Sequence, residues 1–243
     1  GIGGISMSGL ALYLKSRGFS VRGSDICEND RVAALRAAGI DVCPFHKREN
    51  LGDAQIVVQS SAIRADNPEL LAAQERGIKI VGRADLLELI SLDHQNVIAV
   101  AGCHGKTTAT AMWAHVLENW AGGVTAHIGG IDADFGNMKL GGRRFFVTEA
   151  CEYMGNFLKL TPSVALVLNS DADHLDYYGE ESNLFRAYCD FCEKSQAAIV
   201  CAEDKISAYI RPNMTFGLTQ KSDVCAEEIV GQGGKYAFTL RTG

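Results

Sequence analysis

One stretch, from residue 97 to about residue 120, constrains the fold more than any other part of the sequence. An apolar run at 97–101 leads directly into the glycine-containing segment 102–108, and a helix-forming segment follows. A loop between a buried strand and a helix N-terminus points several backbone N–H groups at one place, and the helix dipole adds partial positive charge there. Such a loop binds polyphosphate, and it predicts an α/β fold with helices on the faces of a parallel sheet.

Each residue type in this loop suits phosphate chemistry. Gly102 and Gly105 let the backbone approach phosphate groups closely, Lys106 can neutralise β- and γ-phosphate charge, and the Thr107 hydroxyl can ligate Mg²⁺. The loop is shorter than the common G-x-x-x-x-G-K-[ST] pattern because position 100 is valine, yet the flanking strand and helix favour a nucleotide site over a chance glycine turn. A nucleotide polyphosphate and Mg²⁺, which the family resemblance given below identifies as ATP with its metal ion, are therefore predicted to bind at Gly102, Cys103, His104, Gly105, Lys106, Thr107 and Thr108.

A phosphate loop needs an acidic partner for its metal ion from a neighbouring strand. The predicted strand 145–148 ends at Glu149, which is where ligands of parallel sheets normally sit. We predict Glu149 as a Mg²⁺ ligand, directly or through water, and regard Glu152 as a weaker candidate.

A second polar segment follows the predicted strand 164–168. His174 lies there among acidic residues, where it could ligate a second Mg²⁺ or orient a carboxylate around that ion, while Asp173 and Asp176 could orient His174 or cap the next helix. The acidic surroundings favour a functional histidine over a capping or core one. The predicted catalytic residues are Lys106, Glu149 and His174, and the predicted metal ligands are Thr107, Glu149 and His174.

Composition bounds the class of protein. A length of 243 residues with 47% hydrophobic residues suffices for one large domain or two ordinary ones. A net charge of -6 without a run of Lys or Arg disfavours a nucleic-acid partner, and no apolar run is long enough to span a bilayer. Eight scattered cysteines, with Cys189 and Cys192 at helical i, i+3 spacing, are typical of reduced thiols in a cytosolic protein.

The first ninety residues alternate strand and helix signals. Strands are predicted at 19–22, 40–42, 56–59 and 78–81, and helices at 8–16, 32–38, 69–76 and 84–90. We therefore predict a Rossmann-like parallel-sheet domain at 1–91, followed by a phosphate-loop α/β domain at 92–243. The tail at 223–240 has the pattern of a β-hairpin.

The amino-terminal domain starts with a glycine-rich turn at residues 1–4. Asp25 follows the next strand, an arrangement that predicts a nucleotide diphosphate at the turn with Asp25 near a ribose. The strict G-x-G-x-x-G pattern fails because Ser6 occupies the third glycine position. These residues alone do not distinguish NAD from a UDP-sugar.

Taken together, these segments resemble the Mur ligase family. Residues 102–108 are similar to its loop G-T-x-G-K-T-[ST], and residues 169–176 to its segment N-x-x-x-D-H-x-D. Residues 149–153 and 1–9 resemble the alanine-adding branch, in which the first segment reads G-I-G-G-x-G-M-S-G. Further similarities follow in the same order at 23–25, 60–63 and 67–69, so the resemblance covers nearly the whole chain.

The resemblance implies an ATP-dependent ligase that joins L-alanine to the lactyl carboxylate of UDP-N-acetylmuramate in peptidoglycan precursor synthesis. It implies that Asn169 helps to bind ATP. The residues implied for the UDP-sugar are Gly3, Gly4, Asp25, His46, Ser61 and Arg83. We expect Lys106→Ala to abolish ligation in the full-length enzyme without unfolding it.

The sequence departs from the family at several points. Cys103 replaces a loop threonine and Ser6 replaces a glycine of the first turn. Where several members carry a carbamylated lysine this chain has Cys189, so no carbamate is assigned. The family implies a third domain, and the chain is expected to end inside the second.

Three alternatives stay open at this point. The first is the related ligase that attaches a recovered murein tripeptide to the same UDP-sugar. The second is a nucleotide-binding module that completes no chemistry. The third is an NAD-linked oxidoreductase.

Overall fold

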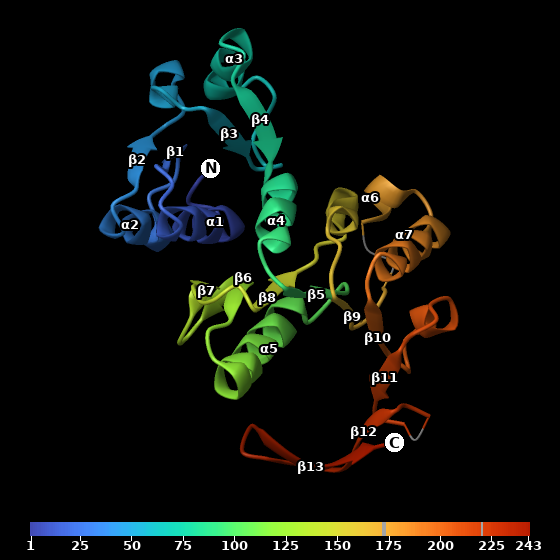
Figure 1. The fold of residues 1–243 in the computed structure, drawn as a ribbon. Helices are drawn as coiled ribbons and strands as arrows, with labels where there is room; N and C mark the ends of the chain where they lie inside the picture. The colour runs from blue at the N-terminus through green and yellow to red at the C-terminus, as the bar shows by residue number, and fades with distance from the viewer. Residues whose placement is uncertain (172–173, 220) are drawn as a thin grey trace. The chain divides into compact units, whose positions relative to one another are not determined.

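The computed structural model describes residues 1–171, 174–219 and 221–243 (Figure 1). Its internal contacts divide it into two compact units. Unit 1 contains residues 1–95 and 111–146, and unit 2 contains residues 96–110 and 147–243. The boundary predicted after residue 91 stays a prediction, since unit 1 takes in residues on both sides of it. Among the helices of the described residues, none combines the length and hydrophobicity needed to cross a bilayer.

Unit 1 is built from short strands and helices in alternation. Its elements are α1 (Ile5–Ser16), β1 (Arg22–Asp25), α2 (Asp30–Ala37), β2 (Asp41–Pro44), the 3-10 helix η1 (Arg48–Leu51), β3 (Ile56–Gln59), α3 (Pro68–Glu75), β4 (Lys79–Gly82), α4 (Arg83–Leu92), most of α5 (Lys106–Ala121), β6 (Thr125–Asp132) and β7 (Gly136–Lys139). β1 pairs with β2 and β3 with β4, both parallel, whereas β6 and β7 form an antiparallel hairpin. Figure 1 shows α1 and α2 in blue beside the β1–β2 pair.

The first strand lies three residues later than the sequence predicted. Gly18, with φ of +86°, ends α1, and the N–H of Phe19 still donates to Leu14 O. Residues 19–21 therefore connect the helix to the strand, which starts at Arg22. Gly23 then comes so close to Ile2 that an added Cβ would lie 2.5 Å from its Cδ1, which leaves no room for a side chain in the strand.

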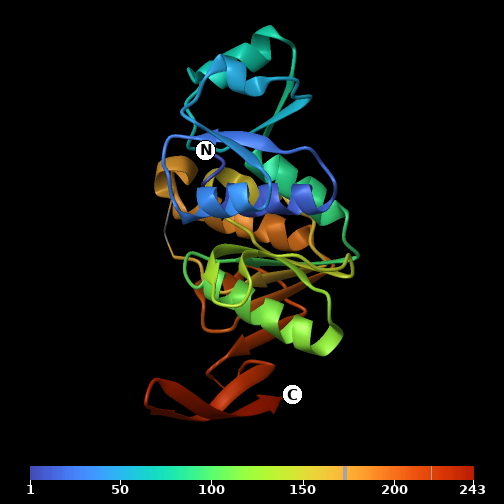
Figure 2. The ribbon, with the colours of Figure 1, turned by 90° about the vertical axis from the view of Figure 1, so that its left-hand side faces the viewer.

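Unit 2 contains most of the large sheet. Its elements are β5 (Asn96–Ala101), the end of β8 (Phe145–Glu149), the 3-10 helix η2 (Tyr153–Lys159), β9 (Val164–Val167), α6 (Leu175–Tyr178), α7 (Glu181–Glu193), β10 (Ala197–Cys201), the 3-10 helix η3 (Lys205–Ala208), β11 (Met214–Gly217), β12 (Val224–Gln232) and β13 (Lys235–Thr242). The strand order is β13-β12-β11-β10-β9-β5-β8. β5 and β9 to β12 run parallel, while β12 and β13 form the predicted hairpin, which Figure 2 shows in dark red at the bottom.

The core of unit 2 lies between the sheet and α7. Leu184, Tyr188 and Phe191 of this helix are fully buried at i, i+4 and i+7, the spacing of one helical face. Phe157 of η2 stacks on Phe191 with ring centroids 5.0 Å apart and meets Tyr188 edge-on at 5.3 Å. The hydroxyl of Tyr188 lies 3.9 Å from Sγ of Cys103, a residue of the loop that follows β5.

The predicted α/β class with mostly parallel strands is confirmed. The sequence analysis missed the β6–β7 hairpin, whose first strand contains Gly129 and Gly130 and so lacks a strong strand signal. That hairpin packs on α1 within unit 1.

Candidate active site

The predicted phosphate loop joins β5 to α5, as the sequence indicated. Gly102 has φ of +137° and Gly105 has φ of +82°, conformations that side-chain-bearing residues rarely adopt. A Cβ on Gly102 would lie 3.1 Å from both the backbone N and O of Asn169. The loop backbone therefore runs directly against the segment that follows β9.

Asn169 shapes the loop through its side-chain amide. Its Oδ1 accepts a hydrogen bond from the backbone N of His104 at 2.9 Å, and its Nδ2 donates to His104 O at 3.0 Å. The same amide thus closes a ring with the loop backbone. The amide therefore fixes the loop backbone at His104, while the predicted role of Asn169 in ATP binding stays a prediction.

Lys106 is the first residue of α5, and its ammonium group turns back into the loop. The Nζ donates to both carboxylate oxygens of Glu152 at 3.1 Å, to Gly102 O, and to Cys103 O at 3.5 Å. The Lys106 side chain is 15% exposed and that of Glu152 only 1%. A buried carboxylate therefore holds the lysine in place.

Glu152 also lies against His174. The distance from His174 Nε2 to Glu152 Oε1 is 3.7 Å, and the ring of Tyr153 lies 5.0 Å from the imidazole. The Tyr178 hydroxyl donates to Glu152 O at 2.5 Å. The structure therefore places the three predicted or candidate groups Lys106, Glu152 and His174 in one cluster within unit 2. Asp173 lies outside the described residues.

Glu149 and the threonines of α5 lie at the same edge of the sheet. Glu149 ends β8, and the next residue, Ala150, donates from its backbone N to Val100 O at 2.8 Å, two residues before the loop. Thr107 and Thr108 are in the first turn of α5. Hydroxyl and carboxylate oxygens are hard ligands of the kind that Mg²⁺ prefers, so Thr107 and Glu149 fit the predicted metal ion.

Cys103 replaces the family threonine with a thiol that makes its own contacts. Its Sγ donates to Asp171 O at 3.0 Å and lies 3.9 Å from the Tyr188 hydroxyl. Burial, and to a smaller degree the charge of Glu152, raises the pKa of Cys103, so the thiol stays protonated and can act as this donor. His104, at the variable loop position, is exposed and lies 3.4 Å from the Asp171 carboxylate.

The glycine turn of unit 1 forms a second predicted site. Gly3 donates from its backbone N to Asp25 Oδ2 at 2.8 Å, and an added Cβ there would lie 2.6 Å from Val32, so only glycine fits. Burial alone would raise the pKa of Asp25, but hydrogen bonds from Cys27 N and Gly3 N outweigh it and the pKa is lowered. Gly4 precedes the first residue of α1. Asp25 is therefore ionised beside the turn, as a ribose partner requires.

The other residues predicted for the UDP-sugar lie in different surroundings. His46 Nδ1 lies 2.8 Å from Ser24 Oγ, and that hydroxyl donates to Glu69 Oε2 at 2.7 Å. Ser61 is exposed in a turn. Arg83 begins α4, and its Nη1 donates to Ser6 Oγ at 3.3 Å.

His127 of β6, which the sequence analysis did not single out, completes this contact. Its Nε2 lies 2.9 Å from Ser6 Oγ, although the two residues are 121 positions apart in the chain. Burial, and second the charge of Arg83, lowers the pKa of His127 from its usual 6.5 to about 4. The imidazole is therefore neutral at neutral pH.

This buried imidazole should make the chain sensitive to acid. Because the pKa of folded His127 lies below that of the unfolded residue, folded-state stability is lost as pH falls from 6.5 towards about 4. We expect the free energy of unfolding to drop by about 2 kcal/mol more between pH 7 and pH 5 in the wild type than in His127→Gln. Denaturant unfolding at the two pH values measures this. His104→Gln, at a side chain 73% exposed, is the control, and an equal drop in His127→Gln would contradict the assignment.

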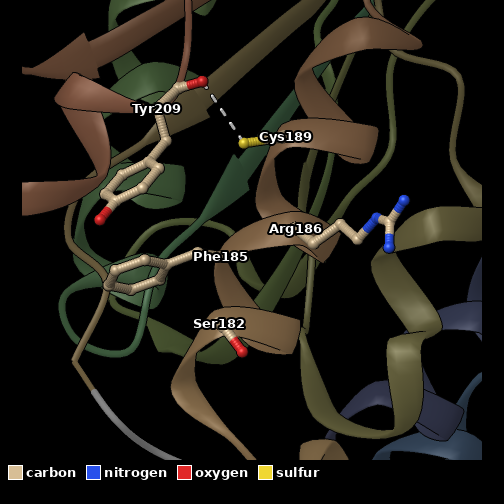
Figure 3. A pocket seen from close by; sticks show the side chains of 5 residues that line it. All are labelled: Ser182, Phe185, Arg186, Cys189 and Tyr209. Carbon is tan, nitrogen blue, oxygen red and sulfur yellow. Dashed lines mark hydrogen bonds between the residues drawn. The ribbon is translucent and has the colours of Figure 1, made fainter.

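The cysteine pair Cys189 and Cys192 lies on α7, and all eight cysteines are free thiols. Cys189 lines a pocket of about 310 Å³, and its Sγ donates to Tyr209 O at 3.6 Å. Figure 3 shows the thiol near the rings of Phe185 and Tyr209. Cys192 is buried, and burial raises its pKa to about 12. Both are therefore free thiols, one half-buried and one buried, as the sequence indicated.

Comparison with known proteins identifies the family. Residues 1–95 match the profile described as Mur ligase family, catalytic domain, and residues 100–240 match the Mur ligase middle domain. The chain belongs to the Mur ligase family. Within it, the UDP-N-acetylmuramate–L-alanine ligase of Acetivibrio thermocellus is 40% identical over 251 residues, covering 99% of this chain and 54% of the relative. This Mur ligase chain thus spans about half the length of the curated relatives it matches.

Solved structures of the family are similar over the whole chain. The UDP-N-acetylmuramate–alanine ligase of Thermotoga maritima matches with a TM-score of 0.92 and 31% identity, covering 100% of this chain and 56% of that one. The UDP-N-acetylmuramate:L-alanyl-γ-D-glutamyl-meso-diaminopimelate ligase of Neisseria meningitidis matches with a TM-score of 0.87 and 26% identity, covering 99% and 82%.

Sequence reasoning missed two features of this Mur ligase site. The ranking of Glu152 below Glu149 as a Mg²⁺ ligand stays a prediction, but the buried ion pair of Glu152 with Lys106 was not foreseen. Tyr178 and Tyr188 were not considered, although Tyr188 lies on the buried stripe of α7 that its i, i+4 spacing could have shown. The roles of the predicted residues stay predictions.

Proposed function

We propose that the full-length protein is a cytoplasmic enzyme that joins L-alanine to the lactyl carboxylate of UDP-N-acetylmuramate, using ATP, in peptidoglycan precursor synthesis. The observation that supports ligation most directly is Lys106, held between the carbonyls of a phosphate loop and a buried carboxylate at the edge of a parallel sheet. The choice of L-alanine rests on relatives that carry that name at about 40% identity.

The residues of the loop divide the work of binding. Backbone N–H groups at the start of α5 and the Lys106 ammonium would bind the β- and γ-phosphates of ATP, with Asn169 holding the loop shape. Thr107, Glu149 and His174 would hold Mg²⁺, which neutralises phosphate charge when bound. In unit 1, the glycine turn would bind the diphosphate of the UDP-sugar, with Asp25 near its ribose.

The proposed reaction has two steps. A lactyl carboxylate oxygen attacks the γ-phosphorus of ATP, and the bond from that phosphorus to the bridging oxygen breaks. ADP departs as the leaving group, and the sugar now carries an acyl phosphate. The neutral amino group of L-alanine then attacks the acyl carbon, phosphate leaves, and the nitrogen loses a proton as the amide forms. The protein contributes positioning and charge neutralisation rather than a covalent intermediate of its own.

A second candidate acceptor is a murein peptide. The similarity to a ligase named for the tripeptide L-alanyl-γ-D-glutamyl-meso-diaminopimelate favours it, at lower identity than the alanine-adding relatives. The phosphate loop and the lysine are equally compatible with both acceptors. A simple nucleotide-binding module would also use Lys106 for phosphate, but it would not need Glu152 and His174 beside that lysine.

ADP release by the full-length protein tests the proposal. With ATP, Mg²⁺ and UDP-N-acetylmuramate, we expect ADP release to depend on L-alanine and to be small with the tripeptide. Dependence on the tripeptide instead would favour the second candidate. No ADP release with either acceptor, or tighter binding of NADH than of UDP-N-acetylmuramate, would contradict the ligase assignment.

A further inference from the structure

The first turn of α1 follows the glycine turn and is hydrogen-bonded to the β6–β7 hairpin, more than a hundred residues later in the chain. Asn137 of β7 donates from Nδ2 to Ile5 O at 2.5 Å and to Ser8 Oγ at 2.8 Å. His127 of β6 lies 2.9 Å from Ser6 Oγ. All of these residues belong to unit 1, and most are well buried. The hairpin therefore fixes where the Ser6 hydroxyl sits.

Arg83 brings a positive charge to the same hydroxyl. Its Nη1 donates to Ser6 Oγ at 3.3 Å, in the first turn of α1, where N–H groups lack helical partners and the dipole is positive. In the part of the chain that the structure describes, Arg83 has no ion-pair partner, whereas Arg36 and Arg48 of the same unit each pair with a glutamate. A half-buried guanidinium beside a helix N-terminus favours the binding of an anion.

The guanidinium fixes the direction of one of these hydrogen bonds, and the tautomer of His127 sets the direction of the other. A guanidinium can only donate, so Ser6 Oγ accepts from Arg83 and its own proton is available to His127. His127 is 3% exposed and its ring is neutral at neutral pH, so in the tautomer protonated at Nδ1 its Nε2 accepts that proton. His127 therefore orients the hydroxyl, and the hydroxyl in turn orients the guanidinium.

We propose that Ser6 and His127 are positioning residues that hold the Arg83 guanidinium against the diphosphate of the UDP-sugar substrate. This inference rests on the proposed function, which supplies the diphosphate. The family pattern has glycine at the position of Ser6, and glycine offers no hydroxyl. The contact is therefore a feature of this chain, and it assigns a role to a strand outside the glycine turn.

The test measures binding of UDP to the full-length protein by calorimetry. Ser6→Ala should weaken UDP binding about five- to tenfold, while Ser6→Thr, which keeps the hydroxyl, should stay within about twofold. In an Arg83→Met background, Ser6→Ala should cause no further loss, because Ser6 acts through the guanidinium. In turnover, KM for UDP-N-acetylmuramate should rise by the same factor with kcat changed less than about twofold.

Two controls separate positioning from a structural role. Ser16→Ala removes a hydroxyl of the same helix that donates to Tyr13 O, and it should leave UDP binding unchanged. Uridine, which lacks phosphates, should bind Ser6→Ala and wild type equally in competition. Additive loss in the Arg83→Met background, or equal weakening of uridine, would overturn the inference. If Ser6→Ala binds UDP with wild-type affinity, only the inference about Ser6 and His127 is overturned. If the wild type fails to bind UDP, the proposed function is overturned as well.

Discussion

Lys106→Met in the full-length protein should lower ATP-dependent ligation by at least about 10³-fold. Methionine keeps most of the unbranched side chain of Lys106 and removes the ammonium group. That group has its donors directed at Gly102 O, Cys103 O and the carboxylate of Glu152, so it lies inside the loop. The loop would keep its backbone N–H groups, and some ATP binding should therefore survive while turnover is lost.

The same substitution should also reduce stability, which sequence reasoning did not foresee. Glu152 is 1% exposed, so without the ammonium group its carboxylate would be buried without that counter-charge, and the nearby His174 Nε2 lies 3.7 Å from its Oε1. Breaking a buried ion pair from one side typically costs about 3–5 kcal/mol. That Lys106→Ala does not unfold the full-length enzyme stays a prediction, and the buried ion pair adds to it an expected fall in stability.

A double variant separates the two effects. Lys106→Met with Glu152→Gln removes both charges, so it should recover most of the lost stability and none of the activity. ADP release and the free energy of unfolding in denaturant measure the two quantities. Lys205→Met, whose ion pair with Glu181 is exposed, is the matched control and should keep both. Wild-type turnover in the double variant would contradict the role of Lys106.

How far the sequence predicted this site depends on whether the signal was local. Gly102 and Gly105 are needed by the backbone itself, so the loop could be located from residue types and a flanking strand and helix. Glu149 could be placed because it lies at the end of a strand. The sequence could not predict that Glu152 turns into the site. Glu152 precedes a segment in which Met154 and Gly155 have left-handed backbone conformations, and no periodic pattern indicates these.

Long-range pairing sets the remaining limit. Ser6 and His127 are polar residues in unrelated segments, and only the packing of the β6–β7 hairpin on α1 brings them together. The strand position at residues 19–22 was wrong for a related reason. The exit from α1 and the close approach of Gly23 to Ile2 are tertiary features, which override the local strand preference of Phe19 and Val21.

Glu152→Gln is expected to lower kcat by about 10²-fold, which is the scale on which misplacement of a catalytic group acts. Both oxygens of the carboxylate contact Lys106 at 3.1 Å, and one lies 3.7 Å from His174. Glutamine has nearly the same volume, but its amide nitrogen is a donor and would face the ammonium group, itself a donor. Lys106 would then keep at most one of the two contacts and lose its buried counter-charge.

Steady-state kinetics of the full-length protein should show a fall in kcat with KM for ATP unchanged or lower. Removing a negative charge beside the proposed phosphate site does not oppose ATP binding, whereas misplacing Lys106 slows phosphoryl transfer. Glu193→Gln, at an exposed position of α7 in the same unit, should leave both constants at wild-type values. A rise in KM for ATP with unchanged kcat would show that Glu152 serves binding alone.

The Lys106→Met background tests the role of Glu152 most sharply. In that background Lys106→Met lowers the free energy of unfolding, whereas adding Glu152→Gln should raise it. If Glu152 acts by holding Lys106, Glu152→Gln should lower activity in the wild type and cause no further loss once Lys106 is methionine. In that background it should also raise the free energy of unfolding, since a buried unpaired charge has been removed. If Glu152 had only a structural role, Glu152→Gln would lower the free energy of unfolding in both backgrounds. That result would show that Glu152 does not belong to the site.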